Sequence, residues 1–221
     1  MTPVIRFPLV LMLVCVVTAG ALSITYVVTA PRIAGRSQER VSEALRHVCP
    51  SGAMEFREVW FEQASSPIYE ALDAQGNVVG YAAIGRRHGY SSELVVLAGV
   101  YPDYRIAAIR VLEAQETPGL GQRVQEAERT QTLWSAVFHF QDAAAPEQDA
   151  EPWFPKQFRN KVPEQLVVET LARPGETKNI AAISGATITS KAVVEAVAQA
   201  IELVREYRRQ HEEGEQAADA Q

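Results

Sequence analysis

The pattern of apolar positions separates an N-terminal apolar segment from a longer region of mixed pattern. From Phe7 to Pro31 the chain has 25 residues without Asp, Glu, Lys, Arg or His. As an α-helix rising about 1.5 Å per residue, this segment would extend roughly 37 Å, more than the roughly 30 Å of bilayer hydrocarbon. The segment therefore predicts an N-terminal transmembrane anchor over residues 1–31.

A cleaved signal peptide is the alternative for this segment, because Ala19-Gly-Ala21 offers small residues at a suitable spacing. The apolar run continues beyond that position to Val28, which favours an anchor that stays in place.

Charge leaves open which side of the membrane the following region occupies. Arg6 precedes the apolar segment, whereas Arg32, Arg36 and Arg40 follow it. A count of positive charges would keep the following region in the cytoplasm. Glu39 dilutes the net charge there, but acids contribute little to this rule. On charge alone the side is undecided.

Residues 32–52 are predicted to form a linker with a short amphipathic helix. Val41, Leu45 and Val48 recur at helical spacing, and Pro50-Ser-Gly52 would end the helix.

From about Trp60 the spacing of apolar residues becomes strand-like. Four apolar runs with short links predict an antiparallel meander over residues 68–72, 78–84, 94–100 and 106–112. Residues 73–77 form the predicted hairpin loop between the first two runs. A further strand is predicted over residues 165–171.

Two helices are predicted to back this sheet, over residues 124–137 and 190–210. The second has an apolar stripe made of Val194, Val197, Ala198, Ile201 and Val204. Residues 142–151 are predicted to be an acidic surface loop, and residues 211–221 a disordered polar tail. The predicted fold class is therefore α+β, with one domain over residues 53–210.

Composition excludes several classes of function. The net charge is 21 minus 27, or −6, and no basic cluster is interleaved with aromatic residues, so nucleic-acid binding has no support. Cys15 lies in the apolar segment and Cys49 is alone in the remaining chain, which leaves no intradomain disulfide. The four histidines are scattered without metal-ligand spacing, and we predict neither a metal site nor a catalytic residue.

The stretch Ser184-Gly-Ala-Thr-Ile-Thr-Ser190 has the composition of an anion-binding turn. Five of its seven residues are Ser, Gly or Thr, and a helix follows directly. The N-terminus of a helix offers unpaired N–H groups and the positive end of the helix dipole, which together favour a phosphate. The plainer alternative is that Thr189 or Ser190 caps the helix, which needs one hydroxyl and leaves the others unexplained.

A second distinctive stretch is Glu116-Thr-Pro-Gly-Leu-Gly121, which follows a predicted strand. Pro118-Gly119 favours a tight turn, and Gly121 keeps the loop low. By itself the stretch is consistent with an ordinary loop or with a wall beside a flat ring.

Together these two stretches resemble the signatures of a family of FMN-binding subunits. The first resembles the flavinylation motif of the G subunit of the Rnf complex and of the C subunit of the sodium-translocating NADH:quinone reductase. Residues 110–121 resemble the family's second signature, and the similarity runs from about Tyr81 to Val204. The chain's length favours the Rnf subunit, with the quinone-reductase subunit as the alternative.

The resemblance implies that Thr187 carries FMN through a phosphoester, attached by a flavin transferase that uses FAD. It also implies an electron relay among other subunits of a membrane complex, with the soluble domain on the periplasmic or extracytoplasmic side of the cytoplasmic membrane. The loop of the second stretch would pack beside the isoalloxazine ring. The residues implied at the cofactor are Thr187, Ser184, Gly185, Ala186, Thr189, Ser190, Glu116, Thr117, Pro118, Gly119, Leu120 and Gly121.

Three positions depart from the family pattern: Ala181 replaces a common Asp, Ala114 a common His, and Ser92 a common Gly. If the missing carboxylate assists the transferase, attachment would be slow or absent. Two other functions stay open, namely a sensory FMN-binding domain and a cofactor-free assembly subunit.

Overall fold

The computed structural model describes residues 3–61, 66–125, 152–172, 175 and 177–219. The chain divides into two compact units, Met1–Glu43 and Ala44–Gln221.

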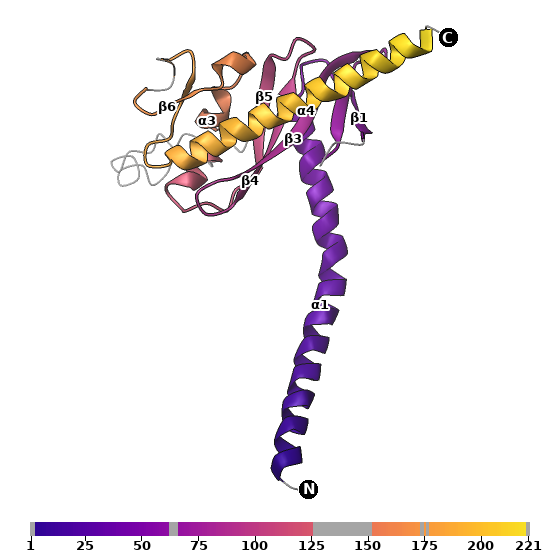
Figure 1. Cartoon of the computed structure of the whole chain (residues 1–221), viewed down its shortest axis with the longest axis vertical. Helices are drawn as coiled ribbons and strands as arrows, with labels where there is room; N and C mark the ends of the chain where they lie inside the picture. The colour runs from indigo at the N-terminus through magenta and orange to yellow at the C-terminus, as the bar shows by residue number, and fades with distance from the viewer. Residues whose placement is uncertain (1–2, 62–65, 126–151, 173–174, 176, 220–221) are drawn as a thin grey trace, which may run out of the picture. The chain divides into compact units, whose positions relative to one another are not determined.

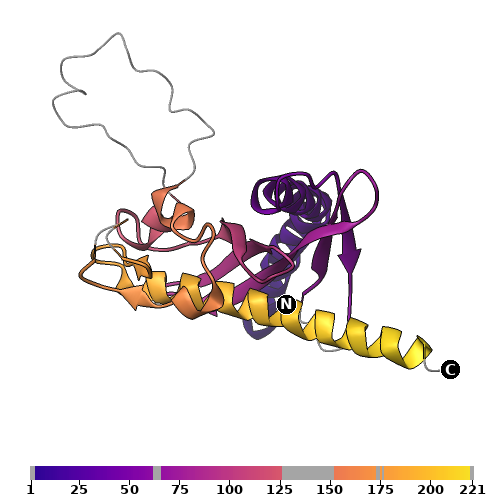
Figure 2. The ribbon, with the colours of Figure 1, turned by 90° about the horizontal axis from the view of Figure 1, so that it is seen from above.

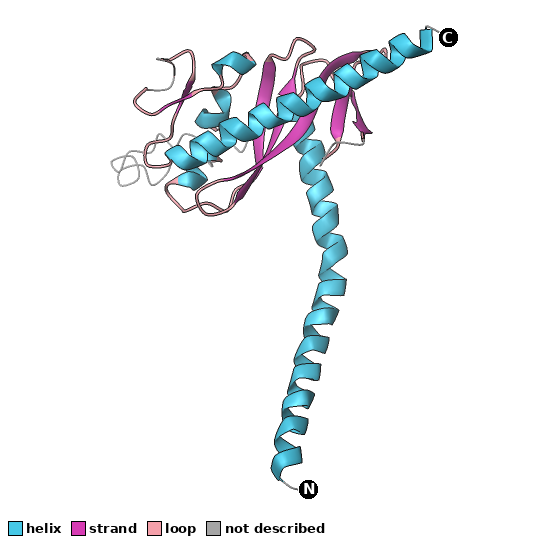
Figure 3. Ribbon diagram, viewed as in Figure 1, coloured by secondary structure: helices cyan, strands magenta, loops and turns pink. Residues whose placement is uncertain are grey.

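The first unit consists of the long helix α1 (Pro3–Val48), whose last turn belongs to the second unit (Figures 1 and 3). Its stretch Leu9–Ala30 is long and apolar enough to cross a membrane and is exposed along its length. The separate linker helix expected over residues 32–52 is not seen, because α1 runs on without a break. Residues 36–48 contain neither Gly nor Pro, and Pro50 follows the end of the helix.

The second unit contains a five-stranded antiparallel sheet in the order β1-β2-β3-β4-β5. Its strands are β1 (Glu55–Val59), β2 (Ile68–Leu72), β3 (Val78–His88), β4 (Glu93–Val100) and β5 (Ile106–Glu113). Four of them confirm the predicted meander. The edge strand β1 was not predicted, because most of its residues are exposed and polar.

Two glycines let other elements approach the two faces of the sheet closely. Gly85 in β3 pairs with Val96, and a Cβ there would stand 1.8 Å from the carbonyl oxygen of Ala196. Gly99 in β4 lies on the opposite face, where a Cβ would stand 2.0 Å from the carbonyl oxygen of Val48. One face is therefore packed by a helix containing residue 196 and the other by the end of α1.

That helix is α4 (Thr187–Asp219), which lies across the sheet in two perpendicular views (Figures 1 and 2). Its buried hydrophobic residues are Ala192, Val193, Val194, Ala196, Val197, Ala200, Ile201, Val204 and Tyr207. Ala198, expected in the stripe, is exposed because the buried face passes through Ala196 and Ala200 instead. The disordered tail expected from residue 211 is helical as far as residue 219, since Glu, Gln and Ala favour helix.

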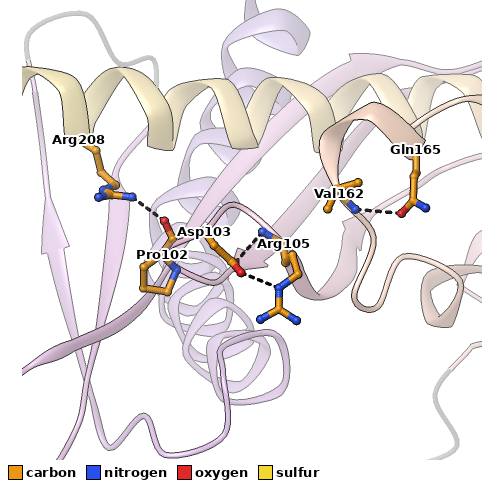
Figure 4. Close-up of polar contacts among 6 residues, drawn as sticks. All are labelled: Pro102, Asp103, Arg105, Val162, Gln165 and Arg208. Atoms are coloured by element: carbon orange, nitrogen blue, oxygen red, sulfur yellow. Dashed lines mark hydrogen bonds and ion pairs between the residues drawn. The ribbon is translucent and has the colours of Figure 1, made fainter.

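The C-terminal half of α4 is also tied to the turn between β4 and β5 (Figure 4). Arg208 donates a hydrogen bond of 2.6 Å from Nη1 to the carbonyl oxygen of Pro102. Within the turn, the Asp103 carboxylate accepts hydrogen bonds from the backbone N–H and Nε of Arg105. The Arg208 bond therefore holds the C-terminal half of α4 to this turn.

Short elements complete the unit: η1 (Gly121–Val124), α3 (Trp153–Lys156), η2 (Pro163–Gln165), β6 (Val168–Glu169) and β7 (Ile180–Ala181). Of the strand expected over residues 165–171 only β6 is seen, and residue 165 belongs to η2. Gln165 Oε1 accepts a hydrogen bond from the backbone N–H of Val162, which closes η2 (Figure 4). Most of the helix expected over residues 124–137, and the loop expected over 142–151, lie outside the described residues.

Candidate functional site

The first motif forms the turn that joins β7 to α4. The backbone N–H of Ala186 donates to the carbonyl oxygen of Ile183 at 2.9 Å, which closes the turn. Gly185 has φ +79°, a conformation that strains other residues, and both Ser184 and Gly185 are exposed. The motif therefore exposes a stretch of backbone that carries only small side chains.

Thr187 is the first residue of α4 and is half-buried. The helix was expected to begin at Ser190, three residues later. The earlier start places the Thr187 side chain in the first turn, where backbone N–H groups lack partners within the helix. A phosphoryl group on Thr187 would meet these donors.

The hydroxyls of Thr189 and Ser190 are buried and bound to the protein. Ser190 Oγ accepts from the backbone N–H of Ile183 at 3.0 Å and donates to the carbonyl oxygen of Ala186 at 2.9 Å. Thr189 Oγ1 donates to Glu116 Oε2 at 3.0 Å. These two hydroxyls thus hold the turn and the helix in place. In contrast, Ser184 is exposed to solvent and Thr187 is partly exposed.

Glu116 is a buried carboxylate that joins three segments. Its Oε1 accepts from the backbone N–H of Ser91 at 3.2 Å, the backbone N–H of Ser92 at 3.1 Å and the Ser92 hydroxyl at 3.3 Å. Burial raises the pKa of the Glu116 carboxyl. The hydrogen-bond donors of Ser91, Ser92 and Thr189 together lower it by more, so the resulting pKa lies below the usual value for a glutamate. The carboxylate is therefore ionised at neutral pH.

Two glycines make room for this carboxylate. A Cβ at Gly89 would stand 2.4 Å from Glu116 Oε1. A Cβ at Gly121 would stand 2.7 Å from Glu116 Oε2 and 2.8 Å from Thr189 Oγ1. No larger side chain fits at either position without displacing the carboxylate.

The loop of the second motif is a compact turn that continues into η1. The carbonyl oxygen of Thr117 accepts from the backbone N–H of Leu120 at 3.2 Å and of Gln122 at 3.3 Å. Gly119 has φ +76°, which explains its place after Pro118. Residues 117–120 are exposed, whereas Glu116 and Gly121 at the two ends are buried.

The structure brings the two predicted motifs together around Thr187. A Cβ at Gly185 would stand 3.1 Å from Leu120 Cδ2, and Gly121 lies against the Thr189 hydroxyl. The loop therefore touches α4 and its preceding turn on both sides of Thr187 in the sequence.

Exposed apolar side chains accompany each of the three segments joined by Glu116. Tyr90 is 68% exposed, Leu120 is 46% exposed and Ile188 is 56% exposed. Apolar surface next to an anion-binding helix terminus suits a flat aromatic ring attached to a phosphate. The residues present therefore fit a flavin nucleotide.

Sequence reasoning missed the turn at residues 89–92 as part of the site. Ser92, noted only as a departure from the family pattern, donates its hydroxyl to Glu116 and accepts from the backbone N–H of Gln115 at 3.0 Å. The available signal was the Gly-Tyr-Ser-Ser sequence, whose small and hydroxyl residues connect β3 to β4.

The two other departures, Ala181 and Ala114, have different surroundings. Ala181 is fully buried, and both its backbone N–H and its carbonyl group bond to the side chain of Gln157. Ala114 is half-buried against the core. In the part of the chain that the structure describes, no three His, Cys, Asp or Glu side chains gather as metal ligands.

Comparisons with known proteins identify a matching family and several relatives. The model of a family described as FMN-binding domain matches residues 89–202, which is 114 of the 221 residues. The G subunit of the ion-translocating oxidoreductase complex of Methanosarcina acetivorans is 28% identical, covering 88% of this chain and 90% of its own length. The G subunit of the Na(+)-translocating ferredoxin:NAD(+) oxidoreductase complex of Acetobacterium woodii is 28% identical, covering 90% and 91%.

A third relative, the G subunit of the ion-translocating oxidoreductase complex of a Vibrio cholerae strain, is 25% identical over 95% of this chain and 94% of its own length. Among solved structures, NqrC of Shewanella oneidensis aligns with 66% of this chain and 64% of its own at 19% identity and a TM-score of 0.42, a similarity too low to carry weight.

Proposed function

This chain belongs to the family of FMN-binding domains, and from that membership we propose that it is a membrane-anchored flavoprotein subunit with FMN bound covalently to Thr187. It relays electrons within an ion-translocating oxidoreductase complex of the Rnf type, as the names of its relatives suggest. The other subunits of that complex and the membrane are its partners.

One observation supports the site most strongly: loop 116–121 meets the attachment motif at Gly185 and at Thr189, one on each side of Thr187. A group bonded to Thr187 Oγ1 would place its phosphate at the first turn of α4 and its ring beside the exposed loop. Leu120 and Ile188 supply apolar surface for that ring.

Attachment is a transfer from FAD by a flavin transferase. Thr187 Oγ1 forms a bond to the phosphorus of the FMN half, the anhydride bond of FAD breaks, AMP leaves, and the hydroxyl proton passes to the transferase or solvent. The exposed turn Ser184-Gly185 gives a second protein access to this hydroxyl. FMN, when attached, would supply one- and two-electron exchange, and the residues of this chain would hold and orient it, so we propose no catalytic residue.

We place the second unit on the extracytoplasmic side of the cytoplasmic membrane, with Leu9–Ala30 as the anchor. A covalent bond prevents loss of the cofactor into a compartment that cannot replace it. Because Arg32, Arg36 and Arg40 argue for the opposite side, reporter fusions at the C-terminus test this directly. We expect the alkaline phosphatase fusion to be active and the green fluorescent protein fusion to be non-fluorescent. The reverse pattern would refute this orientation.

The attachment is tested by in-gel flavin fluorescence after denaturation, with the full chain produced beside a flavin transferase. We expect a fluorescent band for the wild type and none for Thr187→Ala. The control is Ser51→Ala, which removes an exposed hydroxyl of the second unit outside both motifs and should keep the band. A fluorescent Thr187→Ala band would show that the flavin is attached elsewhere.

A further inference from the structure

Glu116 has an unusual set of partners for a residue in a surface loop. Its side chain accepts four hydrogen bonds from the described residues, and all of them reach out of its own loop, three to the turn 89–92 and one to Thr189 in α4. These partners are neutral N–H and O–H groups. A buried anion is thus held without a counter-ion among these partners. Burial of an unpaired charge costs free energy, which a residue with only a packing role would not require.

The same carboxylate is also bonded to the first turn of α4, which contains Thr187. Thr189 lies two residues after Thr187 in the first turn of α4, so the bond from Thr189 to Glu116 fixes the rotation of that turn. Ser190 fixes the preceding turn independently through Ile183 and Ala186. Thr187 lies between these two fixed points.

We propose that Glu116 is a positioning residue that orients Thr187 against loop 116–121 and supplies a fixed negative charge beside the bound flavin. This inference rests on the proposed attachment of FMN to Thr187. The Glu116 side chain is buried, so its charge is poorly screened by water. A fixed anion beside a flavin disfavours the added electrons and lowers the reduction midpoint potential.

The two roles separate in two isosteric variants. Glu116→Gln keeps the shape and can still accept from Ser91 and Ser92, but it removes the charge. Thr189→Val keeps the charge and the shape but removes the hydroxyl that joins α4 to Glu116. Thr189→Ser restores the hydroxyl and serves as the conservative rescue.

The experiment uses the full chain, extracted in detergent after production beside a flavin transferase. Intact mass gives the flavin attached per chain over time, and spectroelectrochemical titration gives the midpoint potential. Glu116→Gln is expected to shift the midpoint potential in the positive direction. Thr189→Val is expected to slow attachment about fivefold or more, the factor that corresponds to one net hydrogen bond, and Thr189→Ser to restore it.

Glu93→Gln is the matched control for charge, because Glu93 follows Ser92 but is exposed. Its midpoint potential should equal that of the wild type, since water and salt screen exposed charges. An unchanged potential in Glu116→Gln, or a shift equal to that of Glu93→Gln, overturns the role of the charge. Full-rate attachment in Thr189→Val overturns the positioning role, even if Glu116→Gln fails to fold. A wild-type chain without attached flavin would instead refute the proposed function itself.

Discussion

Thr189 Oγ1 donates a hydrogen bond of 3.0 Å to Glu116 Oε2, joining two residues that are 73 positions apart. Both side chains are buried. The bond connects the two sequence signatures to one another, so the first turn of α4, with Thr187, and loop 116–121 form a single site. Substitutions around this bond should therefore affect both signatures together.

Gly121→Ala should destabilise the second unit by about 1–3 kcal/mol, the usual effect of forcing a methyl group into a packed region. The new Cβ would stand 2.7 Å from Glu116 Oε2 and 2.8 Å from Thr189 Oγ1, so the bond between them would have to lengthen or break. Thermal unfolding of the detergent-solubilised chain measures this change. Gly35→Ala is the control, since no atom lies within 4 Å of a Cβ there. Equal stability of the two variants would contradict the close packing of Gly121 against Glu116 and Thr189.

The meander was predictable because its signal is local. Residues 94–100 are almost wholly apolar, and residues 73–77 provide turn chemistry, so neighbouring positions determine the strands and the loop. β1 was missed for the same reason, because Glu55 and Arg57 at a sheet edge give no apolar alternation.

The candidate site was predicted as two sets of residues but not as one arrangement. A glutamate in a loop between Gln115 and Thr117 is expected in solvent, and its burial depends on Ser91 and Ser92, which are distant in sequence. The start of α4 at Thr187 rather than Ser190 depends on the turn at Gly185, whose positive φ no local pattern specifies. Tertiary contacts therefore decide which hydroxyls face solvent.

Acid should weaken the second unit partly through Glu116. Its pKa is lower in the folded chain than in the unfolded chain, so the folded state binds fewer protons near the unfolded pKa of about 4.3. The contribution is fully present above that pH and is lost as the pH falls through the lower folded pKa. Thermal unfolding between pH 7 and pH 3 should show a smaller loss of stability for Glu116→Gln than for the wild type.

Three other carboxyls with lowered pKa values, Asp73, Asp103 and Glu206, contribute equally to both chains and cancel in this comparison. Parallel curves for the wild type and Glu116→Gln would show that the Glu116 carboxylate does not contribute to acid sensitivity.

Tyr207→Phe should lower stability without altering flavin attachment. Tyr207 donates its hydroxyl to Glu70 Oε1 at 2.8 Å, and Glu70 is a buried carboxylate in β2 that Arg57 also contacts. Loss of one donor to a buried charge should reduce the free energy of unfolding by about 1–3 kcal/mol. Tyr207 lies 20 residues after Thr187 in the same helix, roughly 30 Å along its axis.

Denaturant unfolding and intact mass, measured on the same preparation, separate these two effects. Tyr69→Phe is the control, because Tyr69 is half-buried and precedes Glu70 in β2, where successive side chains point to opposite faces of the sheet. A Tyr207→Phe chain that unfolds like the wild type would show that the buried carboxylate finds another donor. Reduced flavin attachment in this variant would mean that the two ends of α4 are coupled.

Lys191→Glu should slow flavin attachment, with the larger effect at low ionic strength. Lys191 is exposed and lies four residues after Thr187, so the two share one face of α4. The proposed phosphoester on Thr187 would carry a negative charge, which an ammonium one turn away would stabilise by about 0.3–1 kcal/mol and a carboxylate would oppose. Attachment measured by intact mass over time should be a few-fold slower in about 10 mM salt and nearly normal in about 500 mM salt, where charges beyond a few ångströms are screened.

Glu202→Lys, an exposed charge reversal farther along α4, should leave the rate unchanged at both salt concentrations. Slowing of Lys191→Glu that is independent of salt would assign Lys191 to contact with the transferase instead of to the phosphate charge.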